Sequence, residues 1–496
     1  MSDLDPITLQ VMLGALRAAC DEMGAVLVRS AHSANIKERR DASTALFDAE
    51  GEMVIQAEHI PVHLGAMPSA VAAVLGEEHR PGDAWVLNDP YRGGTHLPDI
   101  TVISPLFWES ELVGFAASRA HHADVGAKEP GSMPADSRTL DDEGVVIPPT
   151  RLTMDVLHDL ARRMRNPSQR EADLRAQLAA GRTGAERVEA LIERFGLETV
   201  RAGMRETLDY AERRTRARIA ELEDGGREAR DVLEAAGDLD LELRLRATVA
   251  GEEIALDFTG SAAQHEGNLN CPLPVTLSAC YFALRVLTDP DVPPCAGAYR
   301  PLTVTAPEGS ILNARPPAAV AAGNVETSSR VADLVLAAFG RALGQGTMNN
   351  VTLGNDDFTY YETIGGGQGA CPDADGPSAV HVAMSNTLNT PVEALELEFP
   401  LRAVEYAVRR GSGGAGRHRG GDGVVRELEA RADMRYSLLT ERRRHPPPGA
   451  DGGRPGAPGR NLLDGRMELP AKASGTLRAG ERLRIETPGG GGHGKD

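Results

Sequence analysis

Hydrophobic residues recur at helical spacing in several parts of the chain. Near its start, Ile7, Val11, Leu16 and Leu27 follow this spacing, and the pattern predicts a helix over residues 6–35. The longest later segment of this kind is rich in Arg and Glu, as expected of helices with one solvated face. The later helical segments are 153–236, 278–287 and 332–343.

Alternating hydrophobic and polar residues predict strands elsewhere. Residues 45–56 have the pattern of a hairpin that turns at Glu50-Gly51. At Leu239 the period changes to two, because leucines alternate with charged residues, and residues 254–258 are expected to pair back after a turn. The shorter candidate strands are 84–87, 100–106, 112–117, 358–363, 380–384 and 482–486.

These patterns predict an α+β fold class: a multidomain, mixed α/β protein with a helical insert and a small β-rich C-terminal domain. A chain of 496 residues is too long for one simple core. We expect a mixed α/β domain with the candidate metal site over residues 1–152 and a charged helical subdomain, acting as scaffold or subunit contact, over 153–236. An α+β domain would follow over 237–410, and a loop-rich β domain over 411–496.

Composition narrows the classes of ligand and partner. The net charge of −19 at pH 7 disfavours nucleic acid, and no apolar run is long enough to suggest a membrane span. The acidic, polar N-terminus is not expected to act as a secretory signal. The five cysteines are scattered without a C-x-x-C spacing, which indicates reduced, mostly structural thiols in a cytoplasmic protein.

Two short segments, 88–99 and 118–124, contain most of the candidate chemistry. His96 and Asp99 are three residues apart with a proline between them, which suggests a tight turn that aims both side chains at one point. His121 and His122 follow a predicted strand, so a hairpin-like return could bring one of them beside His96. Imidazole and carboxylate groups together are typical ligands of a catalytic zinc, manganese or iron ion. The alternative is that these are polar residues of turns and core.

Other motifs are weaker. His59 and His63 are four residues apart, but the intervening Pro61 argues against a regular helix, so pocket lining and a structural role are equally open. The glycine-rich segment 489–496 resembles a phosphate-binding loop, but Asp496 stands where such a loop has Ser or Thr, and a plain loop or tail is favoured. A short match at 257–261 to the turns of actin-like ATPases stands alone, so we do not expect this chain to bind ATP itself.

Several long motifs occur in order along essentially the whole chain. They are 35–41, 57–65, 88–99, 120–126, 130–134, 323–328, 345–350 and 411–423. In these segments the chain resembles the hydantoinase B family. That family includes the B-type component of N-methylhydantoinase, the C-terminal half of ATP-dependent 5-oxoprolinase, and related lactamase and ketone carboxylase subunits such as the acetone carboxylase alpha subunit.

The resemblance implies a division of labour between two proteins. A hydantoinase A-type subunit with an actin-like ATPase fold uses ATP to phosphorylate a small cyclic amide, and the B-type chain then opens the activated lactam or imide ring. The two proteins would form a hetero-oligomer such as a heterotetramer. In the ketone-specific members, the activated substrate is carboxylated instead.

The resemblance also implies a site for a divalent metal ion, of Mn, Zn or Fe type. His96, Asp99 and His121 match the ligands of this site, with Asp41 as a further ligand or a hydrogen-bond partner of the ligands. A divalent metal lowers the pKa of a bound water to about 7 and so supplies hydroxide at neutral pH.

Five further residues receive roles around this expected metal. His122 and Asp124 are expected to act as general base or as supports of the ligands, and His59, His63 and Arg92 are expected to bind substrate. These assignments complete the candidate site.

Two departures from relatives leave the substrate open. The segment before Gln345 is shorter than in relatives, and Ala383 stands where relatives often have a second histidine, two residues after the equivalent of His381. Both positions lie outside the expected ligands. Three hypotheses therefore stay in play: a B-type subunit of an ATP-dependent cyclic amidohydrolase, a ketone carboxylase subunit, and a non-catalytic scaffold for the A-type subunit.

Overall fold

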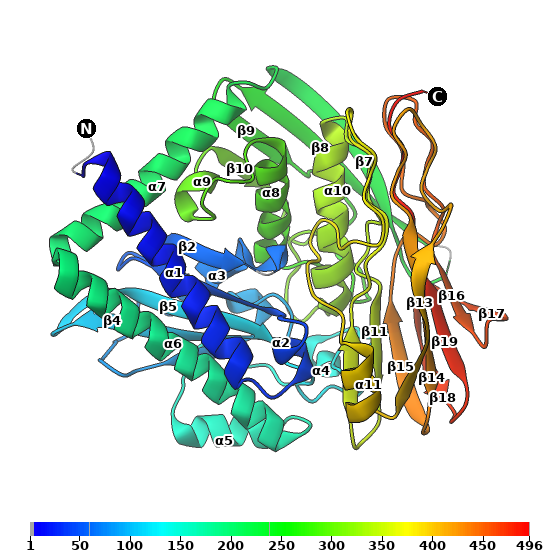
Figure 1. Ribbon diagram of the computed structural model, residues 1–496, viewed down its shortest axis with the longest axis horizontal. Helices are drawn as coiled ribbons and strands as arrows, with labels where there is room; N and C mark the ends of the chain where they lie inside the picture. Colours follow the sequence, from blue (N-terminus) through cyan, green and yellow to red (C-terminus); the bar gives the residue numbers. More distant parts are fainter. Residues whose placement is uncertain (1–3, 59, 238, 496) are drawn as a thin grey trace.

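The computed structural model describes residues 4–58, 60–237 and 239–495. The elements form four β-sheets with helices packed against them (Figure 1), which confirms the predicted α+β class. The shorter helices are α2 (Ala34–Lys37), η1 (Pro61–His63), η2 (Pro90–Arg92), α4 (Leu140–Glu143), α9 (Ala296–Tyr299) and α11 (Val392–Glu398).

The first sheet has six strands in the order β2-β1-β5-β4-β3-β6. They are β1 (Ala42–Phe47), β2 (Met53–Glu58), β3 (Trp85–Leu87), β4 (Asp99–Trp108), β5 (Glu111–His121) and β6 (Thr150–Arg151). Leu46 belongs to the buried cluster that contains α1 (Pro6–Ser30) and α6 (Pro167–Phe195), whereas Phe47 belongs to the cluster that contains α3 (Ala66–Ala72). Because neighbouring side chains of a strand point to opposite faces, the sheet is buried on both sides. Figure 1 shows α1 and α6 crossing one face of this sheet.

Helix α1 ends at Ser30, whereas the sequence predicted a helix to residue 35. The N–H groups of His32 and Ser33 donate to Oδ1 of Asp173 at 2.8 and 3.1 Å. Asp173 lies on α6. Because its carboxylate accepts these two N–H groups, they do not donate to carbonyls of α1, and the helix does not continue. The packing of α6 therefore fixes where α1 stops.

Most of residues 154–219 are helical, as predicted, in α5 (Met154–Arg162), α6 and α7 (Leu197–Ile219). The predicted helix beyond them is wrong, because β7 (Gly225–Glu234) is a strand that pairs along its length with β8 (Asp240–Ala250). Gly225, with a φ of 130°, starts this strand in a conformation that favours glycine. Helix α6 packs against α1, β4 and β5, so this section covers the first sheet. The four domain boundaries remain a prediction.

The second sheet has the strand order β10-β9-β8-β7. Its remaining strands, β9 (Glu253–Asp257) and β10 (Leu302–Thr305), include the hairpin return that the sequence predicted. Leucines 241, 243 and 245 of β8 are buried while their neighbours face solvent, which confirms the alternation. Helix α8 (Leu273–Leu287) packs on α10 (Ser328–Ala338), which covers β7 and β8 and is preceded by the π-helix η3 (Gly323–Thr327).

The other two sheets lie together at the right of Figure 1, with the orders β12-β11-β15-β18 and β13-β14-β19-β16-β17. Several of their strands precede residue 411, where the predicted C-terminal domain begins. The strands are β11 (Asn350–Gly354), β12 (Thr359–Glu362), β13 (Leu401–Arg409), β14 (Gly423–Ala430), β15 (Met434–Leu439), β16 (Arg460–Leu463), β17 (Met467–Leu469), β18 (Lys472–Leu477) and β19 (Arg482–Glu486).

The strand predicted at residues 380–384 is absent from the described part of the chain. These residues make one isolated bridge, between Val380 and Gly366. Ala379 and Ala383 have φ values of 56° and 52°, so the backbone leaves the extended region on both sides of Val380. The segment is instead an irregular, partly buried loop.

A layer of packed glycine backbone lies beside these sheets, and we name it the glycine layer. Its three segments are 411–423, 449–456 and 489–494. The N–H of Gly414 donates to the carbonyl of Gly490, and the N–H of Gly490 donates to the carbonyl of Gly421, both at 2.9 Å. A Cβ on Gly490 would lie 2.0 Å from the carbonyl oxygen of Gln368. Because other backbone carbonyls take these N–H groups, the segment does not offer them to a phosphate, in agreement with the expected plain loop.

The cysteines are unpaired, and the hydropathy of the helices bears on membrane insertion. All five cysteines are free thiols and four are buried; burial raises the pKa of Cys20, for example, which makes such a thiol unreactive. Within the described ranges, no helix combines the length and apolar character needed to cross a membrane.

Candidate metal centre

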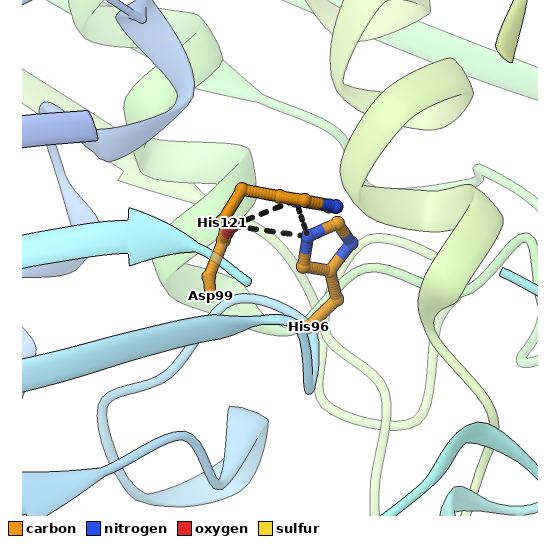
Figure 2. A group of neighbouring side chains, drawn as sticks. All are labelled: His96, Asp99 and His121. Atoms are coloured by element: carbon orange, nitrogen blue, oxygen red, sulfur yellow. Dashed lines mark hydrogen bonds and ion pairs between the residues drawn. The ribbon is translucent and has the colours of Figure 1, made fainter. Parts of the chain in front are cut away.

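His96, Asp99 and His121 converge at one end of the first sheet (Figure 2). Asp99 opens β4 and His121 closes β5, and the two are direct partners in the antiparallel ladder. His96 lies just before β4, in a turn closed by the N–H of Asp99 donating to the carbonyl of His96 at 3.1 Å. The hairpin return expected from the sequence therefore brings His121 beside His96.

The three side chains present one ligand atom each to a common point. Nε2 of His96 lies 3.2 Å from both Nδ1 of His121 and Oδ1 of Asp99, and the latter two are also 3.2 Å apart. Zinc-type ligands at about 2.0–2.2 Å from a tetrahedral ion would be separated by about 3.3–3.6 Å. The triangle of donor atoms therefore fits a divalent ion closely.

Burial and charge prepare these groups for a cation. Burial alone would raise the pKa of Asp99, but the attraction of His96 and hydrogen bonds from His121 and His63 hold that pKa well below its usual value. Burial lowers the pKa of His121 to about 4, so its ring is neutral at pH 7 and has a lone pair that can bind a metal ion. Nε2 of His121 and Nδ1 of His96 are buried without a hydrogen-bond partner among the described residues.

The cluster lines a small cavity, which we name the inner cavity, with a volume of about 20 Å³. His63 also lines it, with Nδ1 2.9 Å from Oγ of Ser43 and Nε2 3.4 Å from Oδ2 of Asp99. Asp41 is a further wall residue, and burial raises its pKa to about 7. Both residues were expected at the site from the sequence, and the structure brings both to it.

Three of the expected residues that the structure describes lie away from the cluster. Nε2 of His122 lies 2.9 Å from Oε1 of Gln177 on α6, away from the inner cavity. Arg92 is exposed on η2 and does not line the cavity. His59 lies outside the described residues.

Asp124 is the third of these residues, and its contacts are those of a loop support. Its carboxylate accepts the N–H groups of Gly126 and Gly131 at 2.7 and 2.8 Å and the Ser132 hydroxyl at 3.1 Å. It also pairs with Arg165 at 2.9 Å. These contacts occupy both oxygens, so the placement of Asp124 does not support a role as base at the cluster.

Sequence reasoning missed several residues of the inner cavity. Nδ2 of Asn324 lies 3.4 Å from Nε2 of His96, and the Tyr361 ring stacks on His121 with ring centroids 4.5 Å apart. Arg39 lies over the same tyrosine, 4.6 Å from its ring centroid. Asn324 belongs to a segment singled out as a motif, 323–328, and its π-helical turn is a feature that often marks functional sites.

Comparisons with known proteins agree on one family. The family model described as Hydantoinase B/oxoprolinase matches residues 5–496. A 5-oxoprolinase of Dictyostelium discoideum is 38% identical over 100% of this chain, which spans 41% of that protein's length. A Pseudomonas sp. (strain NS671) protein, named as the putative B-type component of a D-/L-hydantoinase, is 32% identical over 100% of this chain and 90% of its own. The crystal structure of the ATP-dependent caprolactamase from Pseudomonas jessenii superposes with a TM-score of 0.92 at 30% identity, covering 99% of this chain and 92% of that chain.

Proposed function

This chain belongs to the Hydantoinase B/oxoprolinase family, and on that basis we propose that it is the B-type subunit of an ATP-dependent cyclic amidohydrolase. In this role it opens a lactam or imide ring after a partner protein has phosphorylated the substrate. The observation that carries the proposal is the buried His96–Asp99–His121 cluster, whose three ligand atoms converge beside a cavity. A scaffold has no physical need for such a group.

The names of the relatives support the substrate class. The Dictyostelium protein is called a 5-oxoprolinase and the Pseudomonas jessenii enzyme a caprolactamase, so both names refer to lactams. The chain spans 41% of the former protein, so activity, substrate and partner are carried over here as proposals. The resonance-stabilised carbonyl of a lactam needs activation before hydrolysis, and phosphorylation of its oxygen supplies that activation.

His96, Asp99 and His121 would hold a divalent metal ion, of Mn, Zn or Fe type. When bound, such an ion polarises a carbonyl oxygen and lowers the pKa of a water to about 7. Asp99 is fixed for this role, because its Oδ2 accepts the hydroxyl of Thr95 at 2.6 Å while its Oδ1 faces the two histidines. Burial lowers the pKa of His63, so this ring is neutral, and its Nε2, 3.4 Å from Oδ2 of Asp99, can donate a hydrogen bond that orients the carboxylate.

The partner follows from the same proposal. The Pseudomonas sp. relative is named as one component of a hydantoinase, of B type, which implies a separate A-type component for that protein. For this chain, we infer an A-type ATPase subunit that uses ATP, in a hetero-oligomer such as a heterotetramer. A cytoplasmic location would give both proteins access to ATP.

The test is ATP-dependent turnover by this chain together with its A-type partner. 5-Oxoproline, hydantoin and ε-caprolactam are supplied with ATP and Mg²⁺, and products are identified by mass spectrometry. The proposal expects a product heavier than the substrate by one water, together with ADP and phosphate. His96→Ala should abolish turnover and leave assembly with the partner, measured by size-exclusion chromatography, unchanged; His158→Ala, a partly exposed histidine, is the matched control.

Two other outcomes would contradict the proposal. A requirement for bicarbonate, with a product heavier by carbon dioxide, would make the chain a carboxylase subunit. Loss of assembly in His96→Ala, with no turnover of any cyclic amide by the wild type, would favour the scaffold.

A further inference from the structure

The inner cavity is too small to hold a cyclic amide. Its volume of about 20 Å³ is close to that of one water-sized group, since a cavity needs about 10–15 Å³ to hold a single water. A ring substrate acted on at the cluster must therefore keep most of its atoms outside this cavity. Only the reacting group can enter.

A larger cavity adjoins the inner cavity, and we name it the outer chamber. Its volume is about 510 Å³, within the range of roughly 300–1,000 Å³ that is common for ligand pockets. Ser385 lines both cavities. On another segment, Pro61 of the outer chamber stands between Ile60 and Val62 of the inner cavity. The two cavities thus share walls at two places in the fold.

The outer chamber leads from the surface to the cluster. Its lining includes Arg341 and Asn386, which are exposed, and Ser385, which is only 4% exposed and also lines the inner cavity. Phe282 of α8 and Leu336 of α10 supply apolar walls. This lining suits a small molecule with an apolar face, and Arg341 offers a positive charge to an anionic substituent.

The junction of the two cavities offers hydrogen bonds to a bound molecule. Nδ1 of His381 lies 2.6 Å from Oγ of Ser385. Nε2 of the same ring is buried and has no hydrogen-bond partner in the described part of the chain. Because an unpaired buried polar atom costs free energy, a ligand that pairs with it would be bound more tightly.

We propose that the outer chamber binds the body of a small cyclic amide with an apolar ring face. Ser385 and His381 contact the amide group of this molecule at the entrance to the inner cavity, and a carboxylate substituent on the ring lies near Arg341. This inference rests on the proposed function, because it takes the inner cavity as the place of reaction.

Cys371 provides a test that needs no turnover. This residue lines the outer chamber and is partly exposed, whereas the other four cysteines are buried. The full chain is treated with N-ethylmaleimide, and the rate of Cys371 modification is followed by mass spectrometry with and without ε-caprolactam or 2-pyrrolidinone. A lactam at twice its Kd should slow labelling about threefold, because only the unoccupied chamber admits the reagent. Cys371→Ser gives the background rate.

A second variant narrows the chamber without disturbing the core. Val286 is 44% exposed on α8 and lines the chamber, and Val11 is 46% exposed on α1 and does not. Val286→Trp should raise the KM for lactam of the complex with the A-type partner about tenfold, the scale of one altered apolar contact. Its metal content should stay unchanged, and Val11→Trp should leave KM unchanged.

The outcomes distinguish a failure of the proposed binding in the outer chamber from a failure of the proposed function. If a lactam that the complex turns over does not change the rate of Cys371 labelling by N-ethylmaleimide, the proposed binding in the outer chamber is wrong and the proposed function stands. Protection of Cys371 without turnover would support the chamber and contradict the function. If neither lactam changes the labelling rate and Val286→Trp has the same KM as Val11→Trp, the proposed binding in the outer chamber is also wrong.

Discussion

Asp99 and His121 face each other across the ladder of β4 and β5, with Nδ1 of His121 3.2 Å from Oδ1 of Asp99. The next residue, His122, donates its N–H to the carbonyl of Pro98 at 2.8 Å, but its side chain lies against Gln177. Because adjacent side chains of an extended segment point to opposite sides, only one of the two histidines can join the cluster. This alternation of side chains at the end of β5 places His121, and not His122, at the cluster.

The first prediction concerns metal content. His96→Ala and His121→Ala should each reduce the bound divalent metal per chain by roughly tenfold or more, because each removes one donor of a converging set. Elemental mass spectrometry after dialysis measures the ratio. His158→Ala, at a partly exposed ion pair with Glu171, should retain the wild-type content. Metal that persists in His121→Ala but is lost in His122→Ala would contradict the ligand assignment.

The second prediction concerns Asp124. Asp124→Ala should lower the free energy of unfolding by about 3 kcal/mol, because it leaves a buried N–H group and Arg165 without their acceptor. Urea unfolding measures this change. Asp159→Ala, at an exposed pair with Arg162, should cost under about 1 kcal/mol. Unchanged stability of Asp124→Ala with a large loss of kcat would instead restore the role as base that the sequence suggested.

The third prediction concerns Glu326, a buried residue of the π-helical turn. Burial and the charge of Glu441 raise the pKa of Glu326 to about 8, against the opposing effect of Lys472 and Arg443. The folded state then keeps a proton that the unfolded state loses above its ordinary pKa near 4.5. This residue therefore makes stability fall as pH rises from about 5 to 8, by up to about 1.4 kcal/mol per pH unit.

Glu326→Gln removes this titration without changing the shape of the side chain. Its free energy of unfolding, measured in urea at several pH values, should vary less between pH 5 and 8 than that of the wild type. The exposed Glu189→Gln should follow the wild-type curve. An equally steep fall in Glu326→Gln would show that another group causes the pH dependence.

The fourth prediction compares two glycines. Gly490→Ala should destabilise the protein by several kcal/mol or prevent folding, because its Cβ would lie 2.0 Å from a backbone oxygen that cannot move aside cheaply. Gly14→Ala, on the exposed side of α1 with no atom within 4 Å of the new Cβ, should stabilise by about 0.5–1 kcal/mol. Thermal unfolding of both variants measures the contrast. Equal effects would refute close packing in the glycine layer.

The sequence predicted the centre of the site better than its surroundings. His96, Asp99 and His121 could be grouped because a short turn and one hairpin relate them locally. Asn324 and Tyr361 reach the same cavity from elements more than two hundred residues away in the chain, and no periodicity reports such a contact. Arg92, within the motif 88–99, was expected to bind substrate, but it is exposed on η2.

In the fold, too, some elements could be predicted from the sequence and others could not. Strands and helices with one or two buried faces were found from their hydrophobic period, as in β8 and α1. Strand β7 was mistaken for helix because it is an edge strand in which charged residues, such as the exposed Glu228 and Arg230, break the hydrophobic alternation, as on a charged helix. The glycine layer has no side-chain period, so its order is visible only in the backbone hydrogen bonds.

That layer also has a genetic consequence. Any change at the first or second position of a glycine codon replaces the residue, and every replacement adds at least a Cβ. Gly413, Gly421 and Gly490 each have a backbone atom within 2.0 Å of where that Cβ would lie. A random mutagenesis library of this gene should therefore lose most missense alleles at these codons, while synonymous changes at their third position survive.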